Sequence, residues 1–406
     1  MIDLDDLLAQ VWPLASESET SFEKVGLHQA LGRVLAESLT SALDVPQHDN
    51  SGMDGYAVRS SEILNGRKLP VSQRIPAGAS PLPLQPGTIA RIFTGAPIPP
   101  GADAVVMQED TEVHDDQQVS FKSTPATGQF IRRAGEDISA GQIILKKGTC
   151  LGAVQVGLLA SIGVSEVVVH RRLKVGVMVT GSELQSPGQP LQAGQIYNSN
   201  EFVWCGLLQA MNFQVQSTGI VPDSFKATCE ALLSLADCDV VISSGGVSVG
   251  EEDHVKPALE QVGELRSWKV AMKPGKPIAF GHINRPKGGK AWFFGLPGNP
   301  VSSAVAFKLI VKPFLDLLQG QPASQVDWRL RMQKVEAGFS WLQPDVRREE
   351  FLRVTVQSGQ AMLFRNQSSG VLTSLAETTG LVRLFKGQQV QPGELVDYVS
   401  YQDLMK

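Results

Sequence analysis

The chain has 406 residues, of which 42% are hydrophobic and 19% charged, and its formal net charge at pH 7 is −5. This length predicts roughly two to four domains, and the composition is that of a globular protein rather than a disordered or fibrous one. The negative net charge argues against non-specific nucleic-acid binding through a basic surface, although a local basic pocket remains compatible with it.

Neither the N-terminus nor any hydrophobic segment indicates export or membrane insertion. Residues 1–6 lack the basic region of a signal peptide, and no uncharged apolar run approaches the ~20 residues of a membrane span. The four cysteines form no CxxC pair and show no zinc-site spacing with histidines. We therefore expect a soluble, cytoplasmic protein with reduced thiols.

The beginning of the chain is predicted to be helical. Apolar residues at helical spacing over residues 3–15 predict an amphipathic helix that ends near Pro13. A similar pattern over residues 21–38 predicts a second helix.

A β-rich insertion separates two parts of this helical region. Residues 66–149 are rich in glycine and proline and contain short alternating segments, which is typical of short or edge strands, and the inserted domain is expected over residues 46–145. A helical pattern then begins near residue 151 and precedes a strand at residues 166–169. We expect a helical, linking domain built from residues 1–45 and 146–172, with an elongated β domain inserted between them.

Strands and helices alternate over residues 173–322 at the spacing of βαβ units. This alternation predicts a doubly wound, mainly parallel α/β sheet, and Asn200 is expected to cap one of its helices. After residue 322 short strands and turns return, which predicts a small β domain over residues 323–406. The strands expected in the α/β sheet lie at residues 175–179, 214–221, 240–242, 267–272 and 292–296.

One glycine-rich turn follows a predicted strand within residues 239–253. Residues 240–242 form the β-branched run of a buried strand, and Gly245 and Gly246 then allow positive φ and close approach of the backbone to a ligand. Three acids follow at residues 251–253. Two interpretations remain open: a phosphate cradle beside a divalent cation, or an ordinary strand-to-helix turn with an acidic first helical turn. The segment is neither a P-loop nor a dinucleotide fingerprint.

Three further motifs directly follow predicted strands, at residues 180–183, 273–277 and 296–300. Ligands of an open α/β sheet bind outside the carboxyl ends of its strands. We therefore expect these three turns and the glycine-rich turn to line one shared pocket.

Charged residues in these turns suit an anion and a metal ion. Lys273 and Lys276 lie on a loop stiffened by two prolines and suit an oxyanion or phosphate, with a solvated basic loop as the alternative. Glu183, Asp223 and Asp253 are carboxylates of the kind that bind Mg²⁺ together with phosphate oxygens. For Asp223, capping of the following helix is an equal alternative.

The inserted β domain carries two polar loops. Residues 49–55 contain two acids and two glycines, and residues 132–137 place two arginines beside carboxylates, which an ordinary surface ion pair also explains. The six histidines are dispersed and no Gly-x-Ser-x-Gly elbow occurs, so the sequence favours neither histidine-metal nor serine-hydrolase chemistry.

Together these motifs resemble the molybdopterin molybdenumtransferases, the MoeA family that includes the E domain of gephyrin. The matching blocks follow one another in order across nearly the whole chain. The residues that carry the resemblance are Asp49-Asn-Ser-Gly-Met-Asp54-Gly-Tyr-Ala-Val58, Arg91-Ile-Phe-Thr94 with the following residues to Glu109, Arg132-Arg-Ala-Gly-Glu-Asp137, Thr180-Gly-Ser-Glu-Leu184, Tyr197-Asn-Ser-Asn200, Ser243-Ser-Gly-Gly-Val-Ser-Val-Gly250, Lys273-Pro-Gly-Lys-Pro-Ile-Ala-Phe-Gly281 and Leu296-Pro-Gly-Asn-Pro-Val-Ser302.

The resemblance implies a helical segment, an inserted β domain, a molybdopterin-binding α/β domain and a C-terminal β barrel. It also implies a homodimer whose active cleft lies between the α/β domain of one subunit and the β domain of the other. The implied reaction converts adenylylated molybdopterin and molybdate, with Mg²⁺, into molybdenum cofactor and AMP. The molybdopterin adenylyltransferase and molybdoenzymes are further expected partners, whereas nucleic acid and membranes are not.

The family's functional residues carry over by matching position. The implied catalytic residues are Asp54, Thr94, Asp137 and Glu183, of which the first three would come from the partner subunit. The implied metal ligands are Glu183 and Asp253. The implied molybdate ligands are Lys273, Lys276, Ser302, Arg348 and Ser369. The implied substrate-binding residues are Arg132, Asp223, Ser243, Ser244, Gly245, Gly246, Ser248, Gly250, Asp253, Pro297 and Pro300.

Two positions depart from the family. Ser182 stands where many relatives have aspartate, which leaves more of the metal binding to Glu183, and the segment around Asp223 has one acid where some relatives have two.

Two other functions stay open. A molybdopterin adenylyltransferase would resemble the α/β domain alone, and the β insertion and barrel speak against it. A non-enzymatic scaffold, as the gephyrin E domain also serves, would be supported by an extra domain or a long linker, and the sequence shows neither.

Overall fold

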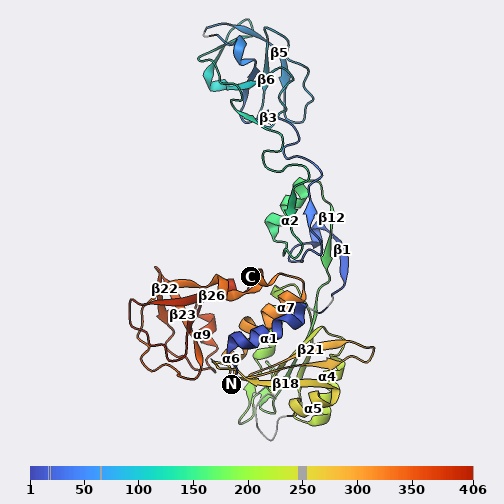
Figure 1. The fold of residues 1–406 in the computed structure, drawn as a ribbon, viewed down its shortest axis with the longest axis vertical. Helices are drawn as coiled ribbons and strands as arrows, with labels where there is room; N and C mark the ends of the chain where they lie inside the picture. The colour runs from blue at the N-terminus through green and yellow to red at the C-terminus, as the bar shows by residue number, and fades with distance from the viewer. Residues whose placement is uncertain (17, 19, 65, 246–253, 406) are drawn as a thin grey trace.

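A narrow stalk rises from a broad base (Figure 1). The computed structural model describes residues 1–16, 18, 20–64, 66–245 and 254–405. The base contains the α/β sheet and the C-terminal β domain, the lower stalk contains the linking segments around β1 and α2, and the inserted β domain forms the tip of the stalk. In the part of the chain that is described, no helix is both long and apolar enough to cross a bilayer.

Helix α1 (Leu4–Ser16) belongs to the base rather than to the stalk. Its apolar face, including Leu4, Leu7 and Leu8, is fully buried in the largest hydrophobic core. The sequence predicts that this helix ends near Pro13, but it continues through the proline to Ser16. Burial of Ala15 against the core offsets the cost of a proline inside the helix.

The predicted helix over residues 21–38 is wrong. This segment instead forms strand β1 (Phe22–Gly26), a short 3-10 turn η1 (Leu27–Gln29) and extended chain leading to β2 (Leu39–Thr40). Glycines at positions 26 and 32 bound the turn, and Gly32 adopts a φ of 73°, which is unfavourable within a helix. The apolar residues therefore pack in the core of the lower stalk from strands and turns rather than from one helix face.

The remaining elements of the lower stalk are short. Strand β1 pairs antiparallel with β12 (Glu166–His170), and β2 pairs with β11 (Ile143–Leu145). Helix α2 (Ala153–Ser161) packs beside them through Leu159. These elements carry the chain between the base and the tip.

The tip of the stalk is a six-stranded sheet in the order β7-β4-β6-β5-β9-β8. A two-stranded ladder of β3 (Asn50–Ser51) and β10 (Ile131–Arg132) adjoins it. The prediction of short strands in a β-rich insertion is confirmed. The six strands are β4 (Gly55–Val58), β5 (Leu69–Ile75), β6 (Ile89–Ile92), β7 (Ala104–Met107), β8 (Thr111–Val113) and β9 (Gln118–Phe121).

The α/β sheet of the base has the order β16-β13-β17-β21-β20-β18, and its first four strands are parallel. Alternate residues of the central strand β17 face opposite sides. Val240 and Ile242 enter a core shared with α1, α3, α6 and α7, whereas Val241 enters a core shared with α4 and α5. The strands are β13 (Lys174–Thr180), β16 (Gln214–Val221), β17 (Val240–Ser244), β18 (Gly263–Lys269), β20 (Pro277–Asn284) and β21 (Lys290–Leu296).

Five helices of the base cover this sheet, in addition to α1. Helix α6 continues through a π-helical segment η4 (Phe307–Val311) into α7. The five are α3 (Asn200–Ala210), α4 (Phe225–Ser234), α5 (Val255–Val262), α6 (Pro300–Ala306) and α7 (Lys312–Leu318).

Strand β20 was not predicted, and the strand expected at residues 267–272 is displaced. Strand β18 begins and ends earlier, at Gly263 and Lys269, and pairs antiparallel with β20, which pairs antiparallel with β21. Two antiparallel steps restore the original direction, so the carboxyl end of β18 points to the same edge as those of β13, β17 and β21. The 273–277 loop therefore still reaches the expected edge of the sheet.

The C-terminal β domain closes into a barrel, as predicted, with β23 pairing to both β24 and β25. Strand β19 (Met272–Lys273), which precedes β20 in the chain, pairs with β23 and joins the barrel to the α/β domain. The barrel strands are β22 (Gln333–Ala337), β23 (Glu349–Gln357), β24 (Gln360–Leu363), β25 (Gly380–Leu384) and β26 (Leu395–Ser400).

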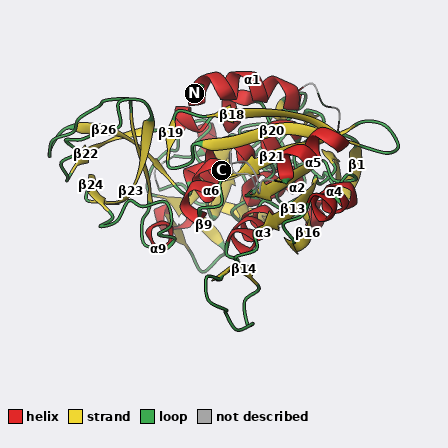
Figure 2. Cartoon of the chain, turned by 90° about the horizontal axis from the view of Figure 1, so that it is seen from below, coloured by secondary structure: helices red, strands yellow, loops and turns green. Residues whose placement is uncertain are grey.

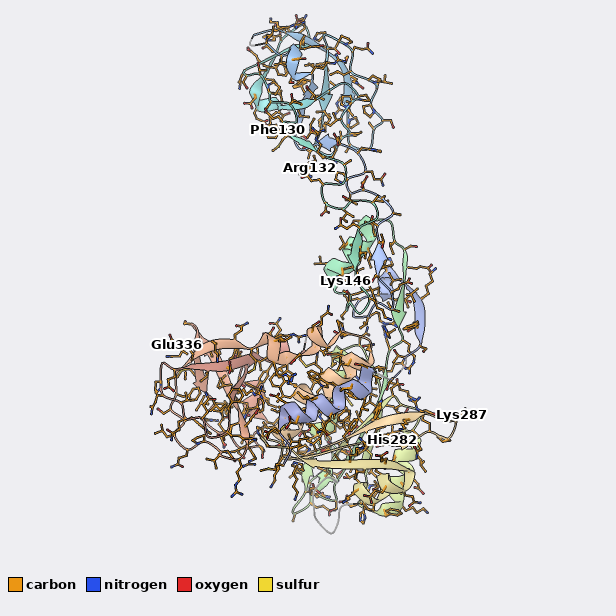
Figure 3. The ribbon with its side chains drawn as sticks, viewed as in Figure 1. Phe130, Arg132, Lys146, His282, Lys287 and Glu336 are labelled. Carbon is orange, nitrogen blue, oxygen red and sulfur yellow. The ribbon has the colours of Figure 1, made fainter. Side chains whose placement is uncertain are left out.

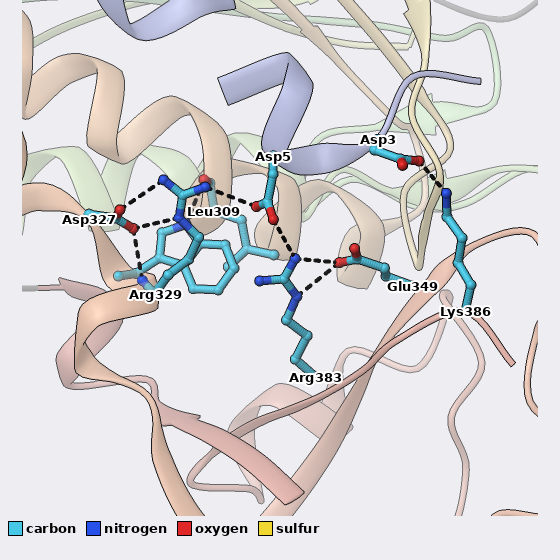
Figure 4. A network of polar contacts seen from close by, with 9 residues as sticks. Asp3, Asp5, Leu309, Asp327, Arg329, Glu349, Arg383 and Lys386 are labelled. Carbon is cyan, nitrogen blue, oxygen red and sulfur yellow. Dashed lines mark hydrogen bonds and ion pairs between the residues drawn. The ribbon is translucent and has the colours of Figure 1, made fainter. Parts of the chain in front are cut away.

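A polar network also joins α1 to the barrel (Figure 4). Asp5 accepts hydrogen bonds from Arg329 at 3.0 Å and from Arg383 at 3.1 Å. Arg383 in turn pairs with Glu349 of β23 at 2.8 Å. The first helix of the chain is therefore fixed to the C-terminal domain by buried and half-buried ion pairs as well as by apolar packing.

Candidate active site

A cleft of about 900 Å³ lies in the base where the sheet's carboxyl edge meets the barrel. The turns after β13, β17 and β21 form one side of the cleft, and the 273–277 loop and the barrel form the other. The predicted convergence of the four turns at one pocket is confirmed for their described parts. The sequence-predicted residues that line the cleft are Glu183, Ser244, Gly245, Lys273, Lys276, Pro297, Pro300, Ser302, Arg348 and Ser369.

The turns after β13 and β17 touch each other through backbone. Gly245 adopts a φ of 84°, and a Cβ at this position would lie 3.1 Å from the carbonyl oxygen of Thr180. Only glycine allows this conformation and this approach without strain. The amide of Gly245 also donates to the carbonyl of Leu296 at 3.2 Å, which brings the third turn alongside.

Asn200 ties these turns together instead of capping a helix. Helix α3 begins at Asn200, Ser199 occupies the N-cap position without a side-chain cap bond, and Asn198 Oδ1 accepts from the amide of Glu201 at 3.3 Å. The buried Asn200 amide donates to Ser244 Oγ and to the carbonyl of Gly298, both at 2.7 Å. The expected capping role is therefore wrong, because the side chain points away from its own helix and into the sheet edge.

Glu183 presents an exposed carboxylate at one end of the cleft. Its side chain folds over Gly181, where a Cβ would lie 2.7 Å from Glu183 Oε2. Asp223 does not line the cleft but accepts a hydrogen bond from the amide of Ser182 at 2.7 Å, and so fixes this turn. The helix cap belongs to Ser224, whose hydroxyl accepts from the amide of Ala227.

Three cationic side chains gather at the other end of the cleft. Lys273 and Lys276 come from the 273–277 loop, and Arg348 comes from the barrel. Ser302 and Ser369 lie beside them, and the amide of Val301 donates to the carbonyl of Ser369 at 3.0 Å. Among the described residues neither serine hydroxyl has a hydrogen-bond partner, so both can donate to an oxyanion. We call the group of these three cations and two serines the oxyanion end.

Ser243, which was expected to contact the substrate, lies away from the cleft. It lies within β17, is fully buried, and does not line the cleft, because alternate strand residues face the interior of the base. Its hydroxyl has no hydrogen-bond partner in the described part of the chain. The predicted residues Gly246, Ser248, Gly250 and Asp253 lie outside the described residues.

Asp54 and Thr94 form a pair at the tip of the stalk. Asp54 Oδ1 accepts hydrogen bonds from both the amide and the hydroxyl of Thr94, each at 2.7 Å. These bonds lower the pKa of Asp54, so that its exposed carboxyl is ionised at neutral pH. The pair presents an exposed carboxylate that is held by two hydrogen bonds.

Asp137 and Arg132 line a separate hollow of about 530 Å³ near the lower edge of the tip. Their neighbours Asp49 and Arg133 form an ion pair of 2.6 Å, which confirms the surface-pair interpretation for Arg133. Arg132, by contrast, forms no ion pair with another described residue. Its guanidinium is available to a ligand or a partner.

The two groups of predicted residues lie in different parts of one chain. Figure 3 shows Arg132 in the stalk, far from His282 in the base sheet. Asp54, Thr94, Asp137 and Arg132 therefore do not meet the cleft of their own chain.

The loop that carries β14 (Leu184–Gln185) and β15 (Ile196–Tyr197), both at the cleft, projects from the base (Figure 2).

The described residues of the cleft offer few donors for a divalent cation. Within the described ranges, no three acidic, histidine or cysteine side chains are close enough to form a protein-only metal site. Glu183 is a single carboxylate in the cleft. This donor set fits Mg²⁺, which commonly takes one or two carboxylates and completes its shell with phosphate oxygens and water.

Several residues of the cleft were not singled out by sequence. Gln367 and Ser368 line it from the barrel, and Glu350 contacts Lys273 from behind. Glu350 lies two residues after the implied ligand Arg348, but adjacent acids and arginines in a strand resemble a solvated face. Its burial depends on the pairing of β19 with β23, which the sequence does not reveal.

Comparisons with known families cover most of the chain. Residues 2–163 match the MoeA N-terminal region (domains I and II), and residues 176–317 match a probable molybdopterin-binding domain. Residues 338–401 match the MoeA C-terminal region (domain IV).

Individual relatives agree with these matches. A molybdopterin molybdenumtransferase of Haemophilus influenzae is 45% identical over 304 residues, covering 74% of each chain. One from Nostoc sp. is 37% identical over 92% of this chain and 87% of its own length. The crystal structure of a molybdopterin biosynthesis MoeA protein from Pyrococcus horikoshii superimposes with a TM-score of 0.82 at 28% identity, covering 99% of this chain and 100% of that one.

Proposed function

The chain belongs to the MoeA family of molybdopterin molybdenumtransferases, and we propose that its cleft is where molybdate meets an adenylylated molybdopterin. The protein is an enzyme of molybdenum cofactor biosynthesis. The observation that carries the proposal is the position of the oxyanion end beside the turns of the sheet's carboxyl edge. One cleft thus offers neighbouring places for an oxyanion and for a phosphorylated organic substrate.

Molybdate is a tetrahedral dianion and needs several donors that surround it. Lys273, Lys276 and Arg348 supply positive charge, and two serine hydroxyls supply directed hydrogen bonds. Both lysines are exposed, so the anion is not enclosed and can leave the site for the pterin. This combination suits a substrate that has to be bound and then transferred.

The adenylylated molybdopterin would lie along the sheet edge. Ser244, Gly245, Pro297 and Pro300 form the described part of this surface, and the tight backbone approach at Gly245 leaves no Cβ in the way of a phosphate. Glu183 would hold Mg²⁺ against the phosphoanhydride. When bound, the ion would supply neutralisation of the charge that develops as AMP leaves.

The chain's own residues would act mainly by position and charge. The lysines hold the oxyanion, the sheet-edge turns hold the pterin phosphate, and the two reactants are thereby kept in one orientation. As the two dithiolene sulfurs bond to molybdenum, oxo groups of molybdate leave as water, and a water or molybdate oxygen attacks the phosphoanhydride so that AMP leaves. Binding both reactants in one cleft accounts for most of the expected rate enhancement.

The residues at the stalk tip would complete the cleft from a second subunit. Asp54, Thr94, Asp137 and Arg132 are polar groups that do not reach the cleft of their own chain. A homodimer in which each stalk tip covers the partner's cleft gives these groups a common site. The enzyme would work in this form in the cytoplasm and pass its product to molybdoenzymes.

AMP release from adenylylated molybdopterin tests the proposal directly. The purified protein should release AMP with Mg²⁺ only when molybdate is added. Incubation with molybdopterin, ATP and Mg²⁺ without molybdate tests the adenylyltransferase alternative. Transfer of AMP to the pterin in that incubation, together with molybdate-independent AMP release in the first, would reject the proposed function.

A further inference from the structure

Glu350 is a buried carboxylate placed directly behind the oxyanion end. Its side chain is only 1% exposed, although it lies next to an open cleft. One oxygen accepts from Lys273 Nζ at 2.9 Å. The other accepts from Trp341 Nε1 at 2.8 Å and from the amide of Asp345 at 2.9 Å. Lys273 belongs to the 273–277 loop, whereas Trp341 and Asp345 lie in the loop between β22 and β23, so this one carboxylate connects the α/β domain to that loop of the barrel.

The contact with Asp345 extends this connection to Arg348. Asp345 accepts from Arg348 Nε at 2.8 Å and pairs with its terminal nitrogen at 2.6 Å. Burial raises the pKa of Asp345, but hydrogen bonds from Arg348 and nearby amides outweigh this effect and lower it. Two of the three cations at the oxyanion end are thus held, directly or through Asp345, by Glu350. Lys276, by contrast, pairs with no carboxylate of the described chain.

The number of donors makes a carboxylate necessary at this position. Three N–H donors converge on the two oxygens of Glu350, and both oxygens of an ionised carboxylate can accept. A glutamine has one accepting oxygen. If that oxygen satisfies Trp341 and the amide of Asp345, its NH₂ group faces the ammonium of Lys273, and the lysine loses its anchor. The Glu350→Gln change therefore releases Lys273 with little change in side-chain volume.

We propose that Glu350 is a positioning residue that holds Lys273 and, through Asp345, Arg348 in the geometry that binds the oxyanion. This inference rests on the proposed function for the identity of the oxyanion. Glu350 itself does not touch the anion. Its carboxylate also offsets part of the positive charge of the site, which helps to keep the anion exchangeable.

Two measurements on the full-length protein test this role. Calorimetric titration with molybdate measures oxyanion binding, and AMP release at varied molybdate and varied adenylylated molybdopterin measures the reaction. Glu350→Gln should weaken molybdate binding about tenfold, as expected for the loss of a charge-assisted hydrogen bond. The half-saturating molybdate concentration should rise equally, while that of the pterin and kcat at saturating molybdate stay nearly constant.

Glu349→Gln is the matched control. Glu349 is the adjacent residue of β23, is also buried, and pairs with Arg383 away from the cleft. This variant should lose stability but keep molybdate binding unchanged. Asp345→Asn is the second test variant, because Asp345 pairs with Arg348 from a half-buried loop whereas Glu350 is fully buried. It should weaken molybdate binding in the same direction as Glu350→Gln.

The outcomes separate the two proposals. Unchanged or tighter molybdate binding in both Glu350→Gln and Asp345→Asn would overturn the positioning role. If the wild-type protein binds molybdate but releases no AMP, the proposed reaction fails, and the calorimetry of the variants still decides the role of Glu350. If the wild-type protein binds no molybdate, both proposals fail.

Discussion

Two inactive variants are expected to restore activity when they share one dimer. Asp54→Ala removes a carboxylate at the stalk tip, and Glu183→Ala removes one in the base. Asp54 belongs to the stalk tip and Glu183 to the base, which lie apart in one chain (Figure 1). Each proposed cleft therefore takes Glu183 from one subunit and Asp54 from the other. A dimer with one variant in each subunit therefore has one cleft with both carboxylates and one cleft with neither.

The expected magnitude follows from this geometry. Each single-variant homodimer lacks one carboxylate in both clefts and should release almost no AMP. A heterodimer isolated with two different affinity tags should recover about half of the wild-type rate, and a randomly paired mixture about a quarter. Binding of adenylylated molybdopterin to the Asp54→Ala homodimer should be largely retained, because the sheet-edge turns are intact.

The reversed arrangement of the same two changes provides the control. A heterodimer of a wild-type subunit with an Asp54→Ala/Glu183→Ala subunit carries the same mutations, but each of its clefts lacks one carboxylate. It should be inactive. Half activity here, combined with no activity in the first heterodimer, would show that each cleft is completed within one chain and would refute the reasoning.

Three further predictions concern stability and binding. Lys312→Met leaves the buried Asp316 without its ion pair of 2.5 Å and should lower the free energy of unfolding in urea by about 3–5 kcal/mol. Lys226→Ala, in an exposed pair of the same spacing, should change this free energy by less than about 1 kcal/mol. Equal losses in the two variants would contradict the prediction. Burial raises the pKa of Asp239, but hydrogen bonds from Arg171 and the Lys174 amide outweigh this effect and lower the pKa. The Asp239 carboxylate therefore stabilises the fold above its unfolded pKa of about 3.9, and this stabilisation is lost as the pH falls through its folded pKa. Urea midpoints of Asp239→Asn should therefore vary less between about pH 5 and 3 than those of the wild type; an equally steep profile would exclude this residue as a cause. Gly245→Ala forces a Cβ into a left-handed turn 3.1 Å from Thr180 and should raise the half-saturating pterin concentration in the AMP assay, whereas Gly206→Ala, where the Cβ meets no atom within 4 Å, should not.

Local pattern was enough to predict the α/β domain because its signals are redundant. The β-branched strand at residues 240–242 lies in the middle of the sheet, and glycine-bearing turns follow it and its neighbours. The direction of parallel strands then places those turns at one edge without any knowledge of side-chain contacts. The position of the cleft follows from this edge alone.

The errors share a different cause, which is pairing between distant segments. Residues 21–38 have helical apolar spacing, but β1 pairs with β12 about 140 residues later, and this pairing outweighs a weak local preference. Glu350 resembles a solvated strand residue until β19 covers it. Asn200 looks like a helix cap until Ser244 and Gly298 offer it better acceptors. Each case is decided by a partner that the local sequence does not contain.

The burial of α1 in the base constrains the order in which the protein can form during synthesis. Its apolar face packs against α7, and Asp5 pairs with Arg383, both of which leave the ribosome about 300 residues or more after α1. The stalk tip, whose strands lie within one continuous segment, can fold while α1 still lacks its partners. A nascent chain that stops before α7 therefore exposes the apolar face of its first helix, and the ion pair of Asp5 with Arg383 forms only after β25 has been made.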